Sequence, residues 1–318
     1  MKLLTQSAMN SFIQCEEKGR LSYIEQLATR GSQALGLGSA VHVGYEEQSA
    51  DAAEKLLRDA HGDAWASFEQ DTLGVDICVA RALVDGGLRL WKNWPKQQEV
   101  EFNLPFLNPA TGRPSTRHRF AGKFDGLWAA GEYAGSSRPV LMEIKTTSRL
   151  DSSYLERLNL DWQVSAYMAA ASQLLGEPVR EMVYRIARKP SIKPRKKVKR
   201  PGKDADGKAV YSPETIPEYM ARLSADYEER PEFYFEEVVV KRTDRQILRW
   251  RHEAWELHER VLKIQAGGMT VRNPSNCFAY GRPCTFFNLC QGVVGPEVFA
   301  VKETANPELK GTNNDSTK

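Results

Sequence analysis

Two carboxylates and a lysine occur in predicted β-strands with a spacing that suits metal-dependent chemistry. Glu143 and Lys145 lie two residues apart in the apolar segment PVLMEIKTTS, so both side chains project from the same face of a strand. The preceding predicted strand contains GKFDG, and its Asp125 would lie beside Glu143 if the two strands pair as a hairpin. Charged groups are costly to bury unless they are paired or bind a ligand. The adjacent carboxylates therefore predict a divalent cation.

Magnesium prefers oxygen ligands and often binds one or two carboxylates together with water and substrate phosphates. Asp125 and Glu143 supply such carboxylates, and Lys145 could orient an attacking water or stabilise charge on a phosphate. This combination suits phosphodiester hydrolysis. The pattern is loose on its own, because a surface salt bridge between Glu143 and Lys145 would also explain the two charges.

Three further side chains could reach the same site. Gln163 and Tyr167 lie four residues apart in the helix predicted after this strand, so they share one helical face. Far upstream, GSAVH places His42 one turn into a helix that follows a glycine-rich break. A lone histidine is more often structural than a ligand, so His42 is informative only in combination with the other residues.

The pattern of apolar residues predicts how these side chains are positioned. Three segments with strand-like alternation (100–106, 118–130 and 138–148) are separated by turn signals and predict an antiparallel meander. A helix from about Asp151 to a glycine stop at Gly176 follows, and 181–189 returns to a strand. The result is a β-β-β-α-β core, and the fold class is α/β (α+β), with a central mixed sheet flanked by helices.

The remainder of the chain divides around this core. We expect a helical N-terminal region over 1–95, the core over 96–188, a basic mobile insertion over 189–210, and further helices and a strand of the core over 211–270. A cysteine-bearing region over 271–300 and a disordered polar tail over 301–318 complete the chain. Within this scheme, a single helix is expected from Met9 to Leu27 and a long helix from Asp244 to Gln265.

The insertion carries a concentrated positive charge. The chain has 318 residues and a formal net charge of +3, yet 188–203 alone contains nine Lys or Arg and no acidic residue. Such a segment is either a solvated loop or an electrostatic contact for a polyanion. The residues that we expect to contact nucleic acid are Lys193, Arg195, Lys196, Lys197, Lys199 and Arg200.

Four of the five cysteines are placed so that they could hold a metal or a cluster. Cys277, Cys284 and Cys290 fall within fourteen residues near the C-terminus, and Cys15 lies near the N-terminus. No secretory signal or apolar stretch long enough for a membrane span is evident, so we expect a cytoplasmic protein without a disulfide framework. Cys78 lies in an apolar helical stretch and is expected to be a core residue.

In this order, G-x-x-x-H, GKFDG, E-I-K and Q-x-x-x-Y resemble the RecB-like branch of the PD-(D/E)XK nuclease superfamily. The arrangement of one plus three cysteines is similar to that of the iron–sulfur members of this branch, which include AddB-type helicase-nuclease subunits and CRISPR-associated and phage exonucleases. The resemblance implies a restriction-endonuclease-like core and a [4Fe–4S] cluster on Cys15, Cys277, Cys284 and Cys290. Zinc is the alternative at the four thiolates, although zinc sites commonly use closer cysteine pairs.

The resemblance also assigns roles in the nuclease site. It implies that Mg²⁺ or Mn²⁺ is held by His42, Asp125, Glu143 and the carbonyl of Ile144, that Lys145 is the catalytic lysine, and that Gln163 and Tyr167 position DNA or the reacting groups. Phe124 stands where the superfamily motif has proline, and Thr147 where this branch commonly has glycine. Neither departure removes a reacting group.

The expected function is therefore a metal-dependent DNA nuclease, most simply an exonuclease that acts on DNA ends in recombination, repair or phage DNA processing. The resemblance implies a preference for single strands and a recombination or repair protein as partner. The alternative is a catalytically inert DNA-binding or accessory protein on the same fold. The intact set of His42, Asp125, Glu143 and Lys145 favours the enzyme.

Overall fold

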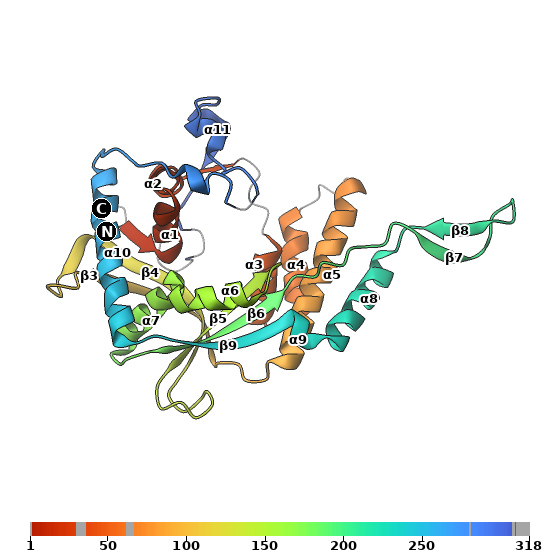
Figure 1. Ribbon diagram of the computed structural model, residues 1–318, viewed down its shortest axis with the longest axis horizontal. Helices are drawn as coiled ribbons and strands as arrows, with labels where there is room; N and C mark the ends of the chain where they lie inside the picture. Colours follow the sequence, from red (N-terminus) through yellow and green to blue (C-terminus); the bar gives the residue numbers. More distant parts are fainter. Residues whose placement is uncertain (1, 30–35, 62–66, 280, 307–308, 310–318) are drawn as a thin grey trace.

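The computed structural model describes residues 2–29, 36–61, 67–279, 281–306 and 309 (Figure 1). A six-stranded mixed sheet forms its centre, with strands in the order β1-β4-β5-β6-β9 and with β3 also paired to β4. The bounds of these strands are Lys2–Thr5 (β1), Gln97–Leu107 (β3), Pro114–Trp128 (β4), Val140–Thr147 (β5), Glu181–Arg188 (β6) and Phe235–Lys241 (β9).

The predicted core is confirmed in its connectivity. Strands β3, β4 and β5 form the antiparallel meander, and β6 lies parallel to β5 after an intervening helix. Strand β9 then adds antiparallel to β6. Strand β1 was not predicted, because four residues are too few to establish a periodic pattern; it pairs parallel with β4 from Lys2↔His118 to Thr5↔Ala121.

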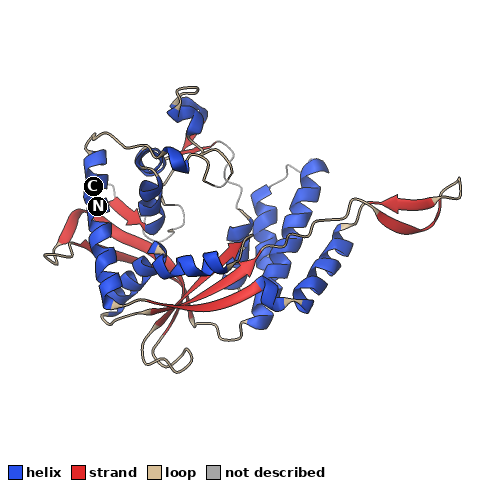
Figure 2. Cartoon of the chain, in the orientation of Figure 1, coloured by secondary structure: helices blue, strands red, loops and turns tan. Residues whose placement is uncertain are grey.

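Helices cover both faces of the sheet, and a separate apolar core lies on each face. The first core joins Met142 and Ile144 of β5 to α3 (Leu37–Glu46), α4 (Ala50–His61), α5 (Ser67–Leu90), α8 (Ile216–Glu229) and α9 (Pro231–Tyr234). The second joins Phe120, Phe124 and Leu141 to α1 (Gln6–Gln14), α7 (Trp162–Leu175) and α10 (Asp244–Gln265). Figure 2 shows these two groups of helices on opposite sides of the sheet.

Two of the expected long helices are interrupted. The helix expected from about Asp151 is divided into α6 (Ser152–Arg157), a 3-10 turn η2 (Leu158–Leu160) and α7, because Asp161 leaves the helical conformation and caps α7. Gly176 ends α7 with φ +71°, as its sequence position indicates. By contrast, α10 has the predicted bounds, and a capping box of Thr243 and Gln246 fixes its start.

The helix expected from Met9 to Leu27 is likewise wrong as one element. Cys15 adopts an extended conformation and separates α1 from α2 (Glu16–Gly19), a π turn η1 (Arg20–Ile24) and β2 (Leu27–Thr29). Strand β2 pairs antiparallel with β10 (Phe299–Val301), so the two ends of the chain are joined. The cysteine-bearing region before β10 contains η3 (Pro274–Asn276), α11 (Phe287–Cys290) and η4 (Pro296–Val298).

The tail expected to be disordered begins with packed residues. The Lys302 amide donates to the Gln26 carbonyl at 2.8 Å, and the Thr5 hydroxyl donates to Asn306 Oδ1 at 3.1 Å. Asn306 and Leu309 are buried. The part of this prediction that concerns 307–308 and 310–318 lies outside the described residues.

The basic insertion also differs from the irregular loop that the sequence suggested. Strands β7 (Val198–Lys203) and β8 (Ala209–Ser212) form a separate antiparallel hairpin, which projects past α8 at one end of the molecule (Figure 1). Polar and charged side chains can form a hairpin without a core of their own when its base is fixed to the body. Among the helices that the structure describes, none has the length and apolar character needed to cross a membrane.

Candidate active site

The register of β4 and β5 brings the two predicted carboxylates together. Gly126 pairs with Met142, so Asp125 is placed opposite Glu143 where the ladder between these strands ends. The amide of Ile144 donates to Asp125 Oδ2 at 2.7 Å. The Asp125 carboxylate therefore accepts the hydrogen bond that a backbone carbonyl of the neighbouring strand would otherwise accept. This bond fixes Asp125 against β5.

Glu143 is buried at the inner end of this site. It is only 1 % exposed, and its Oε1 accepts hydrogen bonds from Lys145 Nζ and, at 2.8 Å, from Gln163 Nε2. Its Oε2 has no hydrogen-bond partner among the residues that the structure describes. Burial and the nearby Asp125 carboxylate raise the pKa of Glu143 to about 8. The surroundings of Glu143 therefore disfavour its charged form, which a bound cation would stabilise.

Lys145 provides the positive charge beside this carboxylate. Its side chain is 31 % exposed, so the ammonium group lies between the buried Glu143 and solvent. Burial opposes the charged form, but the Glu143 carboxylate raises the pKa of Lys145 above its usual range. The Glu143–Lys145 ion pair exists, yet it is not the surface salt bridge that the sequence left open, because its carboxylate is withdrawn from water.

His42 approaches the carboxylates from α3. Its Nδ1 lies 3.7 Å from Asp125 Oδ2, and the start of α3 packs closely on the end of β5, where a side chain at Gly38 would meet Thr146 at 3.3 Å. Burial lowers the pKa of His42, which keeps the imidazole neutral. A neutral imidazole retains the lone pair that a metal ligand requires.

Helix α7 brings Gln163 and Tyr167 to the opposite side of the site. The Asp161 side chain accepts from the Val164 amide at 3.0 Å and so fixes the first turn, from which Gln163 reaches Glu143. The Tyr167 ring packs edge-on against Phe124, at 5.4 Å between ring centroids. Burial raises the pKa of Tyr167, so its hydroxyl stays protonated and can donate a hydrogen bond.

Two further charged residues at this site were missed by the sequence analysis. Lys123 forms an ion pair with Glu99 of β3, and Glu99 faces Asp125 across the strands because its neighbours pair as Gln98↔Gly126 and Val100↔Phe124. Glu99 has φ +51°, a strained conformation for a non-glycine residue that is often found at functional sites. The position of Lys123 two residues before Asp125 was the available signal, whereas the place of Glu99 required the strand register.

These residues fit a hard divalent cation. Glu143 Oε2, which has no hydrogen-bond partner among the described residues, the adjacent Asp125 carboxylate and the neutral His42 together offer oxygen and nitrogen donors for an ion. In the described part of the chain, no three His, Cys, Asp or Glu side chains already lie in a metal-binding arrangement. Closure of His42, Asp125 and Glu143 around an ion would therefore accompany binding.

The four cysteines of the predicted cluster gather where the two ends of the chain meet. The Asn273 amide donates to Cys15 Sγ at 3.4 Å, and Cys277 Sγ lies 4.0 Å from the Asn273 carbonyl oxygen. Burial, Glu17 and the thiols of Cys284 and Cys15 raise the pKa of Cys290. All four thiols are free and half-buried, whereas Cys78 is buried in the core as expected.

The raised pKa of Glu143 predicts how stability changes with pH in the absence of a divalent ion. Between its unfolded pKa near 4.5 and its folded pKa of about 8, the folded state binds more protons at Glu143. Protonated Glu143 therefore makes its full contribution to the free energy of unfolding below pH 4.5. This contribution is lost as the pH rises to about 8, by up to about 1.4 kcal/mol per pH unit.

Glu143→Gln should remove this component. Urea unfolding in EDTA at pH 5.5, 6.5 and 7.5 measures it as the difference between the pH slopes of the wild type and the variant. Identical slopes would show that Glu143 is already ionised at pH 5.5.

Comparison with known proteins gives one family. Residues 3–291 match the family model described as the PD-(D/E)XK nuclease superfamily, and a search of curated protein sequences gave no significant match. Among solved structures, a crystal structure of a protein from Eubacterium rectale named "Putative exonuclease" has a similar fold, with a TM-score of 0.53 and 15 % identity over 92 % of this chain and 94 % of that chain. At this identity the likeness establishes the fold alone.

Proposed function

Since this chain belongs to the PD-(D/E)XK nuclease superfamily, we propose that it is a divalent-metal-dependent deoxyribonuclease that removes nucleotides from DNA ends. The observation that carries the proposal is the buried Glu143 opposite Asp125. Its Oε1 accepts from Lys145, and its Oε2 has no hydrogen-bond partner in the described part of the chain. An inert relative would have no need to keep two carboxylates in this costly arrangement. The resemblance to RecB-like nucleases and the name of the structural relative support exonuclease over endonuclease activity.

The side chains of the site divide the work between them. Asp125, Glu143, His42 and the Ile144 carbonyl would hold Mg²⁺ or Mn²⁺, which when bound supplies Lewis acidity for water and phosphate. Lys145 would hold the attacking water and stabilise negative charge in the transition state. Gln163 fixes the Glu143 carboxylate, and Tyr167 can donate its hydroxyl proton to a bound phosphate. Lys123 adds a second positive charge close to Asp125.

A defined substrate tests this function. Single- and double-stranded oligonucleotides labelled at either the 5′ or the 3′ end are incubated with Mg²⁺ or Mn²⁺, and the released products are sized over time. Early release of labelled mononucleotides or short fragments from one end supports an exonuclease. Internal fragments of many sizes would indicate an endonuclease, and binding without cleavage would favour the inert accessory protein.

For the four cysteines we propose a [4Fe–4S] cluster that ties Cys15 to the C-terminal Cys277, Cys284 and Cys290. Three observations support this proposal. Cys15 and Cys277 both lie beside Asn273, and Cys15 and Cys284 lie close enough to Cys290 to raise its pKa. The pairing of β2 with β10 already joins the same two parts of the chain. When bound, such a cluster supplies a covalent cross-link between the chain ends. Zinc is the competing occupant.

The cluster proposal predicts a spectrum and a stability effect. Protein purified without oxygen should absorb broadly in the visible region and contain about four irons per chain. Cys15→Ser should lose the band and lower the midpoint of thermal unfolding, whereas Cys78→Ser should keep the band. Stoichiometric zinc without iron would contradict the cluster. If the protein contains neither iron nor zinc, the four thiols are packing residues.

We also propose that the basic hairpin contacts DNA. Arg200 is held by Glu218, by Ser212 Oγ at 2.6 Å and by the Pro213 carbonyl at 2.7 Å, so it anchors the base of the hairpin. The remaining expected contacts are exposed, and in the described part of the chain no ion pair engages them; they are Lys193, Arg195, Lys196, Lys197 and Lys199. These side chains are therefore available to phosphate groups.

Neutralising the hairpin should weaken DNA binding without unfolding the protein. The triple variant Lys196→Gln/Lys197→Gln/Lys199→Gln is expected to lower the slope of log Kd against log salt by up to about 2, at about 0.7 per lost single-strand phosphate contact. Fluorescence polarization with labelled DNA in EDTA measures this slope. Lys92→Gln, at an exposed lysine outside the hairpin, serves as the control. If the triple variant has the same slope as the wild type, the hairpin is solvated and does not contact DNA.

A further inference from the structure

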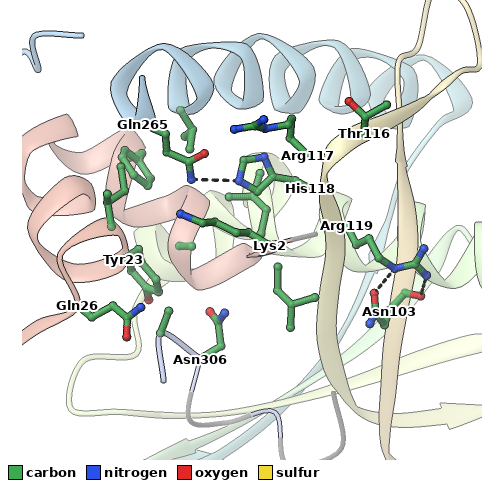
Figure 3. Close-up of a pocket in the computed structure, with 17 residues that line it drawn as sticks. Lys2, Tyr23, Gln26, Asn103, Thr116, Arg117, His118, Arg119, Gln265 and Asn306 are labelled. Atoms are coloured by element: carbon green, nitrogen blue, oxygen red, sulfur yellow. Dashed lines mark hydrogen bonds between the residues drawn. The ribbon is translucent and has the colours of Figure 1, made fainter. Parts of the chain in front are cut away.

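A polar pocket lies along β4 (Figure 3), and neither Asp125 nor Glu143 is among the described residues that line it. Its volume is about 950 Å³, which is sufficient for several nucleotide-sized groups. Strand β1, the first half of β4, α1, the end of α10 and Asn306 surround it. The side chains that give it its character are Lys2, Asn103, Arg117, His118, Arg119 and Gln265.

The pocket is positively charged and lacks compensating acids. Among the described residues that line it there is no Asp or Glu, and none of its three permanent cations, Lys2, Arg117 and Arg119, forms an ion pair in the described part of the chain. Arg119 instead donates to Asn103 Oδ1 at 2.6 Å (Figure 3). Unpaired cations gathered around one cavity attract an anion.

A neutral histidine lies between these cations. His118 is 2 % exposed, and its Nε2 contacts the Gln265 amide nitrogen at 3.2 Å. Burial and the neighbouring His258, Lys2 and Arg117 lower the pKa of His118 to about 4. The positive charge of the pocket at neutral pH therefore comes from its lysine and arginines alone.

The pocket and the metal site share one strand. Arg119 precedes Asp125 by six residues on β4, which corresponds to about 20 Å at about 3.3 Å per residue. Arg119, Lys123 and Asp125 are all partly exposed, and their even spacing places them on the same side of the strand as the buried Ala121. They therefore lie along one side of the strand, with Lys123 between the pocket and the carboxylates.

We propose that this pocket binds the phosphate backbone of the same single nucleic-acid strand that the metal site cleaves, beyond the scissile phosphate. The inference rests on the proposed nuclease function. A strand stacked at about 3.4 Å per nucleotide would span the distance from Asp125 with about six nucleotides, and an extended strand with fewer. The amides of Asn103 and Gln265 and the arginines suit phosphate oxygens, and a free mononucleotide could not use both sites.

The variant Lys2→Ala/Arg117→Ala tests the pocket, because both side chains are exposed and have no side-chain hydrogen bond in the described part of the chain. Lys92→Ala/Arg138→Ala removes two exposed cations outside the pocket and is the matched control. Labelled oligothymidylates of twenty and of three nucleotides are bound in EDTA at several salt concentrations, by fluorescence polarization and by competition. Circular dichroism establishes that the variants are folded.

The expected result depends on substrate length. For the long strand, the pocket variant should bind about tenfold more weakly at low salt, with a slope of log Kd against log salt reduced by about 1.4 for two lost contacts. For the short strand, the Kd values of the wild type, the pocket variant and the control should agree within about twofold. For the long strand, the control should match the wild type. Equal weakening for both lengths, or no change for the long strand, would overturn the inference.

Cleavage distinguishes this inference from the proposed function. With Mg²⁺ or Mn²⁺, kcat/KM of the pocket variant should fall about tenfold for the long strand relative to the short one. If the wild type cuts neither strand, the nuclease function fails, whereas the polarization result still decides whether the pocket binds a nucleic-acid strand. If a mononucleotide displaces the labelled DNA as effectively as the long strand does, the pocket binds free nucleotides instead. That result would overturn the inference.

Discussion

Asp125→Asn is expected to lower DNA cleavage by at least about a thousandfold and to weaken divalent-ion binding. The amide keeps an oxygen that can accept the Ile144 N–H bond of 2.7 Å, so the strands should stay in register. It removes the negative charge that a hard cation requires beside Glu143. Single-turnover cleavage and calorimetric titration with Mn²⁺ measure the two effects.

Asp59→Asn is the control for this variant, because Asp59 is an exposed residue of α4 paired with Lys55. It should cleave and bind Mn²⁺ like the wild type. Undiminished cleavage by Asp125→Asn would show that Asp125 is not catalytic, and it would contradict the assignment of these residues as the catalytic centre.

Lys145→Met should separate catalysis from metal binding. The loss of a charge-stabilising donor in the transition state is expected to lower the cleavage rate about 100- to 1000-fold. Mn²⁺ binding should be retained at pH 8 or become tighter, because the ammonium group that now neutralises Glu143 competes with a cation for Oε1. The same two measurements used for Asp125→Asn apply here.

The contrast between the two variants is the informative outcome. Asp125→Asn should lose both properties, whereas Lys145→Met should lose only cleavage. If Lys145→Met also fails to bind Mn²⁺ while it remains folded, the lysine acts by holding Glu143 in place and not on the reacting groups. Lys92→Met controls for the loss of an exposed lysine elsewhere.

Much of the site could be predicted because local rules fix it. Spacing of two in a strand places Glu143 beside Lys145, and spacing of four in a helix places Gln163 beside Tyr167. The turn signals between the strands indicate a hairpin, and the hairpin brings Asp125 to Glu143. The bounds of the helix from Asp244 to Gln265 were likewise predicted, and a capping box of Thr243 and Gln246 fixes its start in the structure.

The errors in the predicted fold have a common cause. Strand β1 and the β7–β8 hairpin are short, so their stability comes from a neighbouring strand or a fixed base and leaves no clear periodic signal. The break at Cys15 interrupts an otherwise helical pattern where the chain turns toward the C-terminal cysteines. Tertiary contacts decide such positions against local propensity.

The sequence by itself determined the family pattern, the order of the core elements and the pairing of two carboxylates with a lysine, because each depends on short-range spacing. Only the tertiary structure decided that Glu143 is buried with an unsatisfied oxygen, since that depends on α7 packing over β5. It also decided the opposition of Glu99 to Asp125 and the assembly of a basic pocket from Lys2, Arg117 and Arg119. These features join residues that are distant in the chain, and strand register and helix packing bring them together.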